Sequence, residues 1–271
     1  MDALLLALAR IADAAGALIR GIYATDFTVQ WKQPKDPVTE ADRQANELIC
    51  EALARELPGV PVVAEESDPA RFAGYRDTPQ AFFVDPLDGT REFVEKNDQF
   101  AVMIGLADGG RAVAGAVCIP MEGTTFIGAP GHGAWRLTAS NVREPIRVST
   151  TTVLAHAQLL ISRSHRTAAI ERAAAHLGVR GVLPVGSAGL KGVRVAEGAA
   201  DLYVAPRHGG KRWDTCATDA LVRAAGGGFS DIEGHPIDYR GTSLDNDRGV
   251  IATNGLLHDA VRELLASAPQ P

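Results

Sequence analysis

The chain has 271 residues and a formal net charge of −6. This length exceeds the usual size of a single hydrophobic core, which favours two lobes. No run of Lys and Arg is long enough to neutralise many phosphates, so a nucleic acid polymer is not an expected partner. A small polyanion stays compatible with this charge, provided that cations and local basic residues reverse the field at one site.

The three cysteines, Cys50, Cys118 and Cys216, are scattered and lack C-x-x-C spacing. This pattern argues against a disulfide framework and against zinc, and it favours a reducing cytoplasm. The N-terminus contains several leucines, but charged residues interrupt them well short of the roughly 20 apolar residues of a membrane span. We therefore expect neither a membrane anchor nor a cleaved signal peptide.

Apolar residues from Leu4 to Ile22 recur at spacings of three and four, which predicts an amphipathic helix. A second helix is predicted from about Thr39 to Leu57, with the segment 36–42 at its beginning. Strands are predicted at 60–64, 81–84, 100–107, 111–119 and 124–128. The first of these strands ends at Glu65-Glu66, which places two carboxylates at a strand end.

The stretch 130–145 is rich in Gly, Pro and polar residues, which favours a lobe boundary near its end. After it we predict strands at 157–161 and 202–204 and helices at 167–177, 189–198 and 215–225. Gly226 and the two glycines after it suit the end of the last helix. The sequence thus predicts an α/β protein, with an α+β lobe over 1–147 and an α/β lobe over 148–271.

The most informative segment is Asp85-Pro86-Leu87-Asp88-Gly89-Thr90, which directly follows an apolar run. Two carboxylates three residues apart, with a proline fixing φ between them, can converge on a hard cation. The Leu87 carbonyl would face the same ion. If Thr90 begins a helix, the free N–H groups of its first turn lie where a phosphate can be held.

Each acidic motif also has a purely structural interpretation. Thr39-x-x-Asp42 has the spacing of a capping box, Glu65-Glu66 fits a solvated pair, and Asp214 fits a helix cap. Two like charges 4 Å apart, however, repel by about 4 kcal/mol at an effective dielectric near 20. If these carboxylates converge, they require cations. Because the candidate donors are all oxygens, the expected cation is Mg²⁺.

Four motifs, in this order, resemble those of the lithium-sensitive, magnesium-dependent phosphatases of the inositol monophosphatase superfamily. Each family pattern has a counterpart in this chain. D-x-V-T-x-x-D is similar to 36–42, E-E to 65–66, D-P-[IL]-D-G-T to 85–90, and W-D-x-x-A followed by A-G-G to 213–217 and 225–227. The resemblance implies a layered αβαβα sandwich like that of fructose-1,6-bisphosphatase. It also implies two or three Mg²⁺ ions per site and inhibition by Li⁺.

The same resemblance implies a role for each site residue. The implied metal ligands are Glu65, Asp85, the Leu87 carbonyl, Asp88 and Asp214. Thr90 and Asp42 would orient and deprotonate the attacking water, and the Gly89 and Thr90 amides would hold the phosphoryl group. Two nearby Mg²⁺ ions can supply a bound nucleophile and stabilise the leaving oxygen, so direct attack by water is expected.

Within the superfamily, the chain most resembles the 3'(2'),5'-bisphosphate nucleotidases, which convert 3'-phosphoadenosine 5'-phosphate to AMP. Three segments carry this resemblance: 91–93 after the D-G-T, the S-R-S-H at 162–165, and the glycine-rich turn with a lysine at 186–191. The implied substrate contacts are Glu65, Asp88, Gly89, Thr90, Ser162, His165, Ser187, Lys191 and Asp214. Basic residues at Lys191, Arg207, Lys211 and Arg212 would suit a second phosphate.

Several alternatives stay open at this point. His165 also fits a structural loop histidine, and Lys191 a solvated helix residue. The substrate alternative is an inositol or other sugar phosphate on the same metal site. A non-catalytic nucleotide- or metal-binding module is conceivable, and Gly128-x-x-Gly131-x-Gly133 prompts a dinucleotide-dependent oxidoreductase, although its spacing is wrong for G-x-G-x-x-G. We expect a monomer or homodimer acting in sulfur metabolism.

Overall fold

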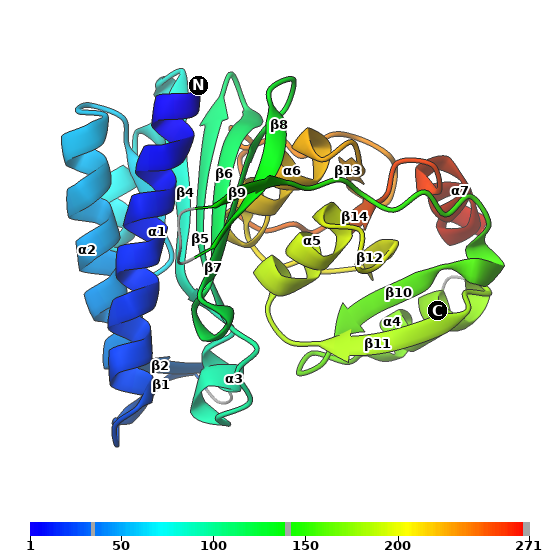
Figure 1. Cartoon of the computed structure of the whole chain (residues 1–271), viewed down its shortest axis with the longest axis horizontal. Coiled ribbons are helices and arrows are strands. Elements are labelled where there is room, and N and C mark those ends of the chain that lie inside the picture. Colours follow the sequence, from blue (N-terminus) through cyan, green and yellow to red (C-terminus); the bar gives the residue numbers. More distant parts are fainter. Residues whose placement is uncertain (34–35, 139–141, 268–271) are drawn as a thin grey trace.

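The computed structural model describes residues 1–33, 36–138 and 142–267. Two sheets alternate with three layers of helices, as Figure 1 shows. Helices α1 (Asp2–Tyr23) and α2 (Glu40–Glu56) lie side by side on the outer face of the first sheet. Helices α5 (Ala188–Ala196) and α6 (Cys216–Ala224) separate the two sheets. The expected αβαβα sandwich is confirmed.

The first sheet has seven strands in chain order, and only the pairing between β3 and β4 is parallel. Its strands are β3 (Val62–Ala64), β4 (Gln80–Asp88), β5 (Ala101–Asp108), β6 (Arg111–Ile119), β7 (Thr124–Ala129), β8 (Gly133–Thr138) and β9 (Arg143–Pro145). The stretch 130–145 therefore contains two strands that its composition did not predict. The glycines at 128–133 belong to the β7–β8 hairpin, which is not a dinucleotide-binding turn.

The second sheet has five strands in the order β11-β10-β12-β14-β13. They are β10 (Gln158–Ser162), β11 (Gly181–Val185), β12 (Leu202–Ala205), β13 (Gly228–Ser230) and β14 (Val250–Thr253). Helices α4 (Ala168–His176) and α7 (His258–Ser267) supply apolar side chains to its outer face. No helix in the described ranges is both long and apolar enough to span a membrane.

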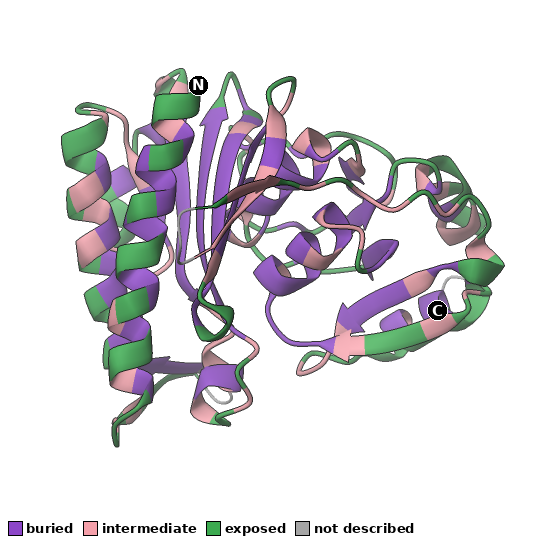
Figure 2. Ribbon diagram, viewed as in Figure 1, coloured by how far each residue is buried: buried purple, intermediate pink, exposed green. Residues whose placement is uncertain are grey.

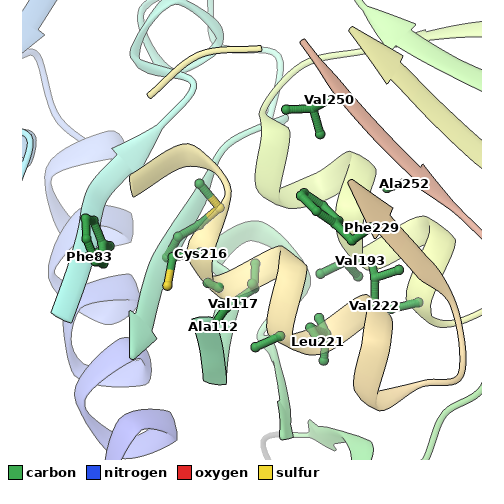
Figure 3. Close-up of a cluster of buried hydrophobic side chains, with 14 of the residues drawn as sticks. Phe83, Ala112, Val117, Val193, Cys216, Leu221, Val222, Phe229, Val250 and Ala252 are labelled. Carbon is green, nitrogen blue, oxygen red and sulfur yellow. The ribbon is translucent and has the colours of Figure 1, made fainter. Parts of the chain in front are cut away.

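Alternation along the strands divides the apolar side chains between separate cores. On β4, Phe82 faces α1 and α2, whereas Phe83 faces the layer between the sheets. Figure 2 shows the resulting buried stripes on the strands and on the inner faces of α1 and α2. Figure 3 shows the shared core, where Leu221 and Val222 of α6 lie among side chains from both sheets. The two halves are therefore joined by one continuous core, and the boundary at residue 147 stays a prediction.

Two glycines let α6 approach the first sheet closely. A Cβ at Gly105 on β5 would lie 2.6 Å from the Ala217 nitrogen, and one at Gly115 on β6 would lie 2.2 Å from the Ala217 oxygen. Side chains at these positions would push α6 away from the strands. Because Asp214 lies just before α6, this close packing brings its carboxylate toward the end of β4.

One boundary differs from its prediction. Residues 36–39 do not begin the second helix; they form β2 (Asp36–Thr39), which pairs with β1 (Val29–Gln33) in a separate hairpin. Thr39 is the cap of α2, and its extended backbone continues the strand up to the cap. The helix pattern alone could not show this hairpin, because strand pairing depends on a partner outside the pattern.

Candidate active site

The D-P-L-D-G-T segment forms the end of β4 and the turn into a short helix, α3 (Thr90–Val94). The register of β4 against β5 shifts between Asp85 and Asp88, and Asp88 still pairs with Ala101, so the strand end carries a local bulge. Gly89 has a φ of 100°, which disfavours other residues, and a Cβ there would lie 3.0 Å from the Gln99 oxygen. The predicted helix at Thr90 is present.

Three carboxylates from distant parts of the chain converge beside this turn. Glu65, Asp85 and Asp214 each offer an oxygen within 4.8 Å of an oxygen of the other two. Parallel pairing of β3 with β4 aligns Ala64 with Val84, which places the first two carboxylates side by side. The third carboxylate, that of Asp214, lies just before α6 and is brought to the site by the packing of that helix. The clustering expected from the sequence is therefore present for these three residues.

Burial raises the pKa of all three carboxyl groups, and the negative charge of neighbouring carboxylates adds to each shift. The pKa of Glu65 rises to about 8, through burial and then through the charge of Asp214, while Lys32 opposes the shift. The pKa of Asp214 rises to about 7, through burial and then through Asp88. The pKa of Asp85, which is 3% exposed, is raised well above its usual range by burial and by Glu65.

These carboxylates fit a divalent cation of the hard, oxygen-binding kind. All three donors are oxygens, and a bound cation would replace their mutual repulsion by attraction. The nearest ammonium belongs to Lys32, whose Nζ lies 3.5 Å from Glu65 Oε1 and also contacts Glu66. Sequence reasoning missed this lysine, because only the β1–β2 hairpin brings it to the site.

Asp88 is placed differently from the three clustered carboxylates. Its Oδ2 accepts hydrogen bonds from the Ser187 hydroxyl and, at 2.6 Å, from the Gly189 amide. Ser187 has a φ of 59°, unusual for a residue with a side chain, and its hydroxyl also accepts from the Leu190 amide as the cap of α5. Asp88 therefore ties the end of β4 to the beginning of α5.

Asp42 and Thr90 are in direct contact. The Thr90 hydroxyl donates to Asp42 Oδ1 at 2.8 Å and lies 3.2 Å from the Leu87 carbonyl oxygen. Asp42 Oδ2 accepts from the Thr39 amide at 2.7 Å and from its hydroxyl at 2.6 Å. Burial raises the pKa of Asp42 against these hydrogen bonds. The capping box is thus real, and the second oxygen of the same carboxylate reaches Thr90.

The predicted substrate segments border this site. Ser162 ends β10, and its hydroxyl accepts from the His165 amide at 3.1 Å. Lys191 is 3% exposed rather than solvated, and its ammonium donates to the carbonyl oxygens of Val185 at 3.3 Å and Ser187 at 2.5 Å. Burial lowers the pKa of Lys191 to about 8. Burial, followed by the charge of Arg91, lowers the pKa of His165.

Lys211 and Arg212, which were also expected to suit a second phosphate, each contact a side chain of the protein. The Lys211 ammonium lies 2.5 Å from Asp245 Oδ1, and Arg212 donates to the side chain of Asn246. The Lys211 amide donates to Asp214 Oδ2 at 2.6 Å. These contacts hold the turn around Asp214, and the expected role of Lys211 and Arg212 toward a second phosphate stays a prediction.

A family model described as the inositol monophosphatase family matches residues 1–270. The chain belongs to the inositol monophosphatase family. It is therefore an enzyme, a phosphatase, as its motifs predicted. Among curated relatives, it is 36% identical over 233 residues to the 3'(2'),5'-bisphosphate nucleotidase CysQ of Escherichia coli K12, covering 85% of this chain and 91% of the relative. It is 31% identical to human 3'(2'),5'-bisphosphate nucleotidase 1, covering 90% and 88%.

Solved structures of family members share the fold over almost the whole chain. The suhB protein of Bartonella henselae superimposes with a TM-score of 0.84 at 27% identity, covering 98% of this chain and 99% of that one. CysQ of Bacteroides thetaiotaomicron superimposes with a TM-score of 0.77 at 28% identity, covering 93% and 97%. The inositol monophosphatase of Anabaena reaches 0.80 at 28% identity, covering 99% and 97%.

Proposed function

We propose that the chain is a Mg²⁺-dependent phosphatase that hydrolyses the 3'-phosphate of 3'-phosphoadenosine 5'-phosphate to AMP and phosphate. The convergence of Glu65, Asp85 and Asp214 carries the metal part of this proposal. The substrate part is supported by the curated relatives, which are named for 3'(2'),5'-bisphosphates. The S-R-S-H segment and the glycine-rich turn with its lysine lie beside the site and support it further.

Glu65, Asp85, the Leu87 carbonyl, Asp88 and Asp214 would hold the metal. Bound Mg²⁺ would supply charge neutralisation of the phosphoryl oxygens and would lower the pKa of a coordinated water. The family resemblance supports two or three ions per site and inhibition by Li⁺. The resemblance supports a role in sulfur metabolism, and the scattered cysteines support a reducing cytoplasm. The proposed state is a monomer or homodimer.

Thr90 and Asp42 would prepare the attacking water. Because the Thr90 hydroxyl gives its hydrogen to Asp42, its oxygen is free to accept a hydrogen from a water and so orient it. When the water attacks, its proton can pass to Thr90 as the Thr90 hydrogen passes to Asp42. The raised pKa of Asp42 makes that carboxylate a better proton acceptor than an exposed aspartate.

The remaining predicted contacts concern binding and orientation. The Gly89 and Thr90 amides would hold the transferring phosphoryl group. Ser162, His165, Ser187 and Lys191 would contact the rest of the nucleotide. Lys191 already donates to two carbonyl oxygens, so a substrate phosphate would compete with the Ser187 carbonyl for its ammonium.

A substrate panel tests the assignment. Release of phosphate is measured from 3'-phosphoadenosine 5'-phosphate, inositol 1-phosphate and fructose 1,6-bisphosphate, each with Mg²⁺ and again with a chelator. We expect the nucleotide to give the highest kcat/KM and the chelator to abolish release. A preference for either sugar phosphate would overturn the nucleotide assignment. The inositol alternative has support of its own, because an inositol monophosphatase structure matches 99% of this chain.

A further inference from the structure

The two residues after Thr90 hold a single residue of the second half of the chain. The Arg91 guanidinium donates to the Ser164 carbonyl oxygen at 2.8 Å, and the Ser164 hydroxyl donates to Glu92 Oε1. Ser164 lies inside the S-R-S-H segment, between Ser162 and His165. Helix α3 thus begins at a proposed catalytic residue and, within one turn, fixes a segment proposed to bind substrate.

Glu92 is buried, with 3% of its surface exposed. A buried carboxylate is costly without a partner, and hydrogen bonds to charged groups are the stronger ones in proteins. The Ser164 hydroxyl supplies such a bond. By contrast, Glu95 lies just beyond α3, is half exposed and reaches Arg163 of the same segment only through an ion pair at 3.6 Å. Of these two acidic contacts to the segment, the buried one is expected to dominate.

Glu92 also packs against the second substrate segment. A Cβ at Gly186 would lie 2.4 Å from the Glu92 Cγ, so the backbone of the glycine-rich turn rests directly on this side chain. The Gly186 amide is held in addition by Gln99 Oε1 at 2.7 Å. The negative charge of Glu92 acts to raise the pKa of both His165 and Lys191, against the lowering by burial. One carboxylate therefore neighbours both segments.

We propose that Glu92 is a positioning residue that sets substrate choice. Through Ser164 and Gly186, it holds the segments 162–165 and 186–191 at a fixed place relative to Thr90. This inference rests on the proposed function and deepens it, because it names the class of ester that benefits. Esters with a second anionic group reach these segments, whereas a small monoester such as p-nitrophenyl phosphate contacts only the metal-side residues.

The test compares Glu92→Ala, Glu92→Gln and Ser164→Ala with Glu95→Gln as the matched control. For 3'-phosphoadenosine 5'-phosphate with Mg²⁺, we expect Glu92→Ala to raise KM about tenfold or more, the equivalent of one lost charged hydrogen bond. We expect kcat to change much less than KM, and the preference over p-nitrophenyl phosphate to fall by a similar factor. Glu92→Gln should recover most of the loss, and Glu95→Gln should change KM less than twofold.

A double-mutant cycle shows whether Glu92 acts through Ser164. If it does, Glu92→Ala combined with Ser164→Ala raises KM no more than the larger single effect. Additive effects, or equal losses for the nucleotide and for p-nitrophenyl phosphate, would overturn the inference and leave Glu92 with a purely structural role.

A second measurement needs no substrate, so it separates this inference from the proposed function. The Arg163 amide donates to the Val185 carbonyl at 3.1 Å, and the His165 amide donates to Ser162. Hydrogen exchange at these two amides should become faster in Glu92→Ala and stay unchanged in Glu95→Gln. Unchanged exchange in Glu92→Ala would refute the positioning role. If the wild type prefers another ester, the proposed function fails. The KM comparison is then repeated with that ester. The hydrogen-exchange result does not depend on the substrate and still tests the positioning role.

Discussion

Two groups of acidic side chains in this protein have spacing that suits a metal ion, and their surroundings differ. Glu65, Asp85 and Asp214 form one group, and Asp231, Glu233 and His235 form the other. In the second group, Arg248 Nε lies 2.9 Å from Asp231 Oδ2, and the backbone amides of Glu233 and His235 donate to Asp231 Oδ1 at 3.0 and 2.8 Å. The protein itself thus supplies a positive charge and two hydrogen bonds to Asp231.

The first group has less compensation of this kind. Burial, followed by the negative charge of neighbouring carboxylates, raises the pKa of Glu65 to about 8 and that of Asp214 to about 7, and the only ammonium in ion-pair contact among the described residues is that of Lys32 at Glu65. Spacing alone therefore does not identify a metal site. The informative difference is whether the fold supplies its own counter-charge, because an uncompensated cluster of carboxylates is costly unless a cation joins it.

The largest expected difference between the groups is in turnover. Asp85→Asn removes a charge from the first group, and Mg²⁺-dependent phosphate release should fall by more than about 100-fold, which exceeds the usual effect of losing an outer partner of a metal ligand. Asp231→Asn is the matched control in the second group and should retain activity. Near-normal turnover in Asp85→Asn, or equal losses in both variants, would contradict the assignment of the site.

The next largest effect is on thermal stability. A ligand at 100 times its Kd stabilises the folded state by about 2.7 kcal/mol. For a chain of this size, that free energy corresponds to a rise in Tm of about 5 to 10 °C. Saturating Mg²⁺ should therefore raise the Tm of the wild type and of Asp231→Asn, but not that of Asp85→Asn. Calorimetry with and without a chelator measures the shift, and an equal shift in all three proteins would place the ion elsewhere.

The pH dependence of stability follows from the same carboxyl groups. The pKa of Glu65 rises from 4.5 to about 8 on folding, and that of Asp214 from 3.8 to about 7. At a pH between the unfolded-state and the folded-state pKa of either group, the folded state binds more protons than the unfolded state. Without metal, the free energy of unfolding contributed by these groups should therefore fall as the pH rises from about 4 to 8.

Urea unfolding at several pH values checks this slope against a variant that carries both Glu65→Gln and Asp214→Asn. We expect the variant to have a shallower decline than the wild type. Mg²⁺ should oppose the decline in the wild type, because metal binding requires the deprotonated carboxylates and strengthens as the pH rises. A wild type whose stability increased across this range relative to the variant would show that the carboxyl groups are not crowded in solution.

Local patterns were enough to predict much of this molecule. The periodicity of α1 and α2 comes from neighbouring residues, and the structure has both helices close to their predicted bounds. The strand predicted at 81–84 is also present, but it continues through Asp88. The motifs also named all three members of the acidic cluster. Such patterns succeed where the feature is encoded within about 20 consecutive residues.

The remaining features depend on partners that are distant in the chain. Strand β13 (Gly228–Ser230) is only three residues long and gains its place by pairing with β14. Lys211 and Arg212 contact Asp245 and Asn246, which lie more than 30 residues later in the chain, and the contact of these two basic residues with a phosphate stays a prediction. A charged side chain has no local signature that reveals whether the fold will provide its counter-charge.

The smallest expected effect comes from making the second acidic group resemble the first. Arg248→Gln removes the guanidinium beside Asp231, whose side chain is buried, while Arg248 itself is 60% exposed. Solvent screens such a pair, so unfolding should become easier by only about 1 kcal/mol or less, with activity retained. Chemical unfolding and a Mg²⁺ titration of this variant sharpen the comparison. If Arg248→Gln gains stability from Mg²⁺ beyond the wild-type shift, the arginine is what keeps the second group from binding metal. If it does not, the two backbone hydrogen bonds to Asp231 are enough to stabilise its carboxylate without a cation.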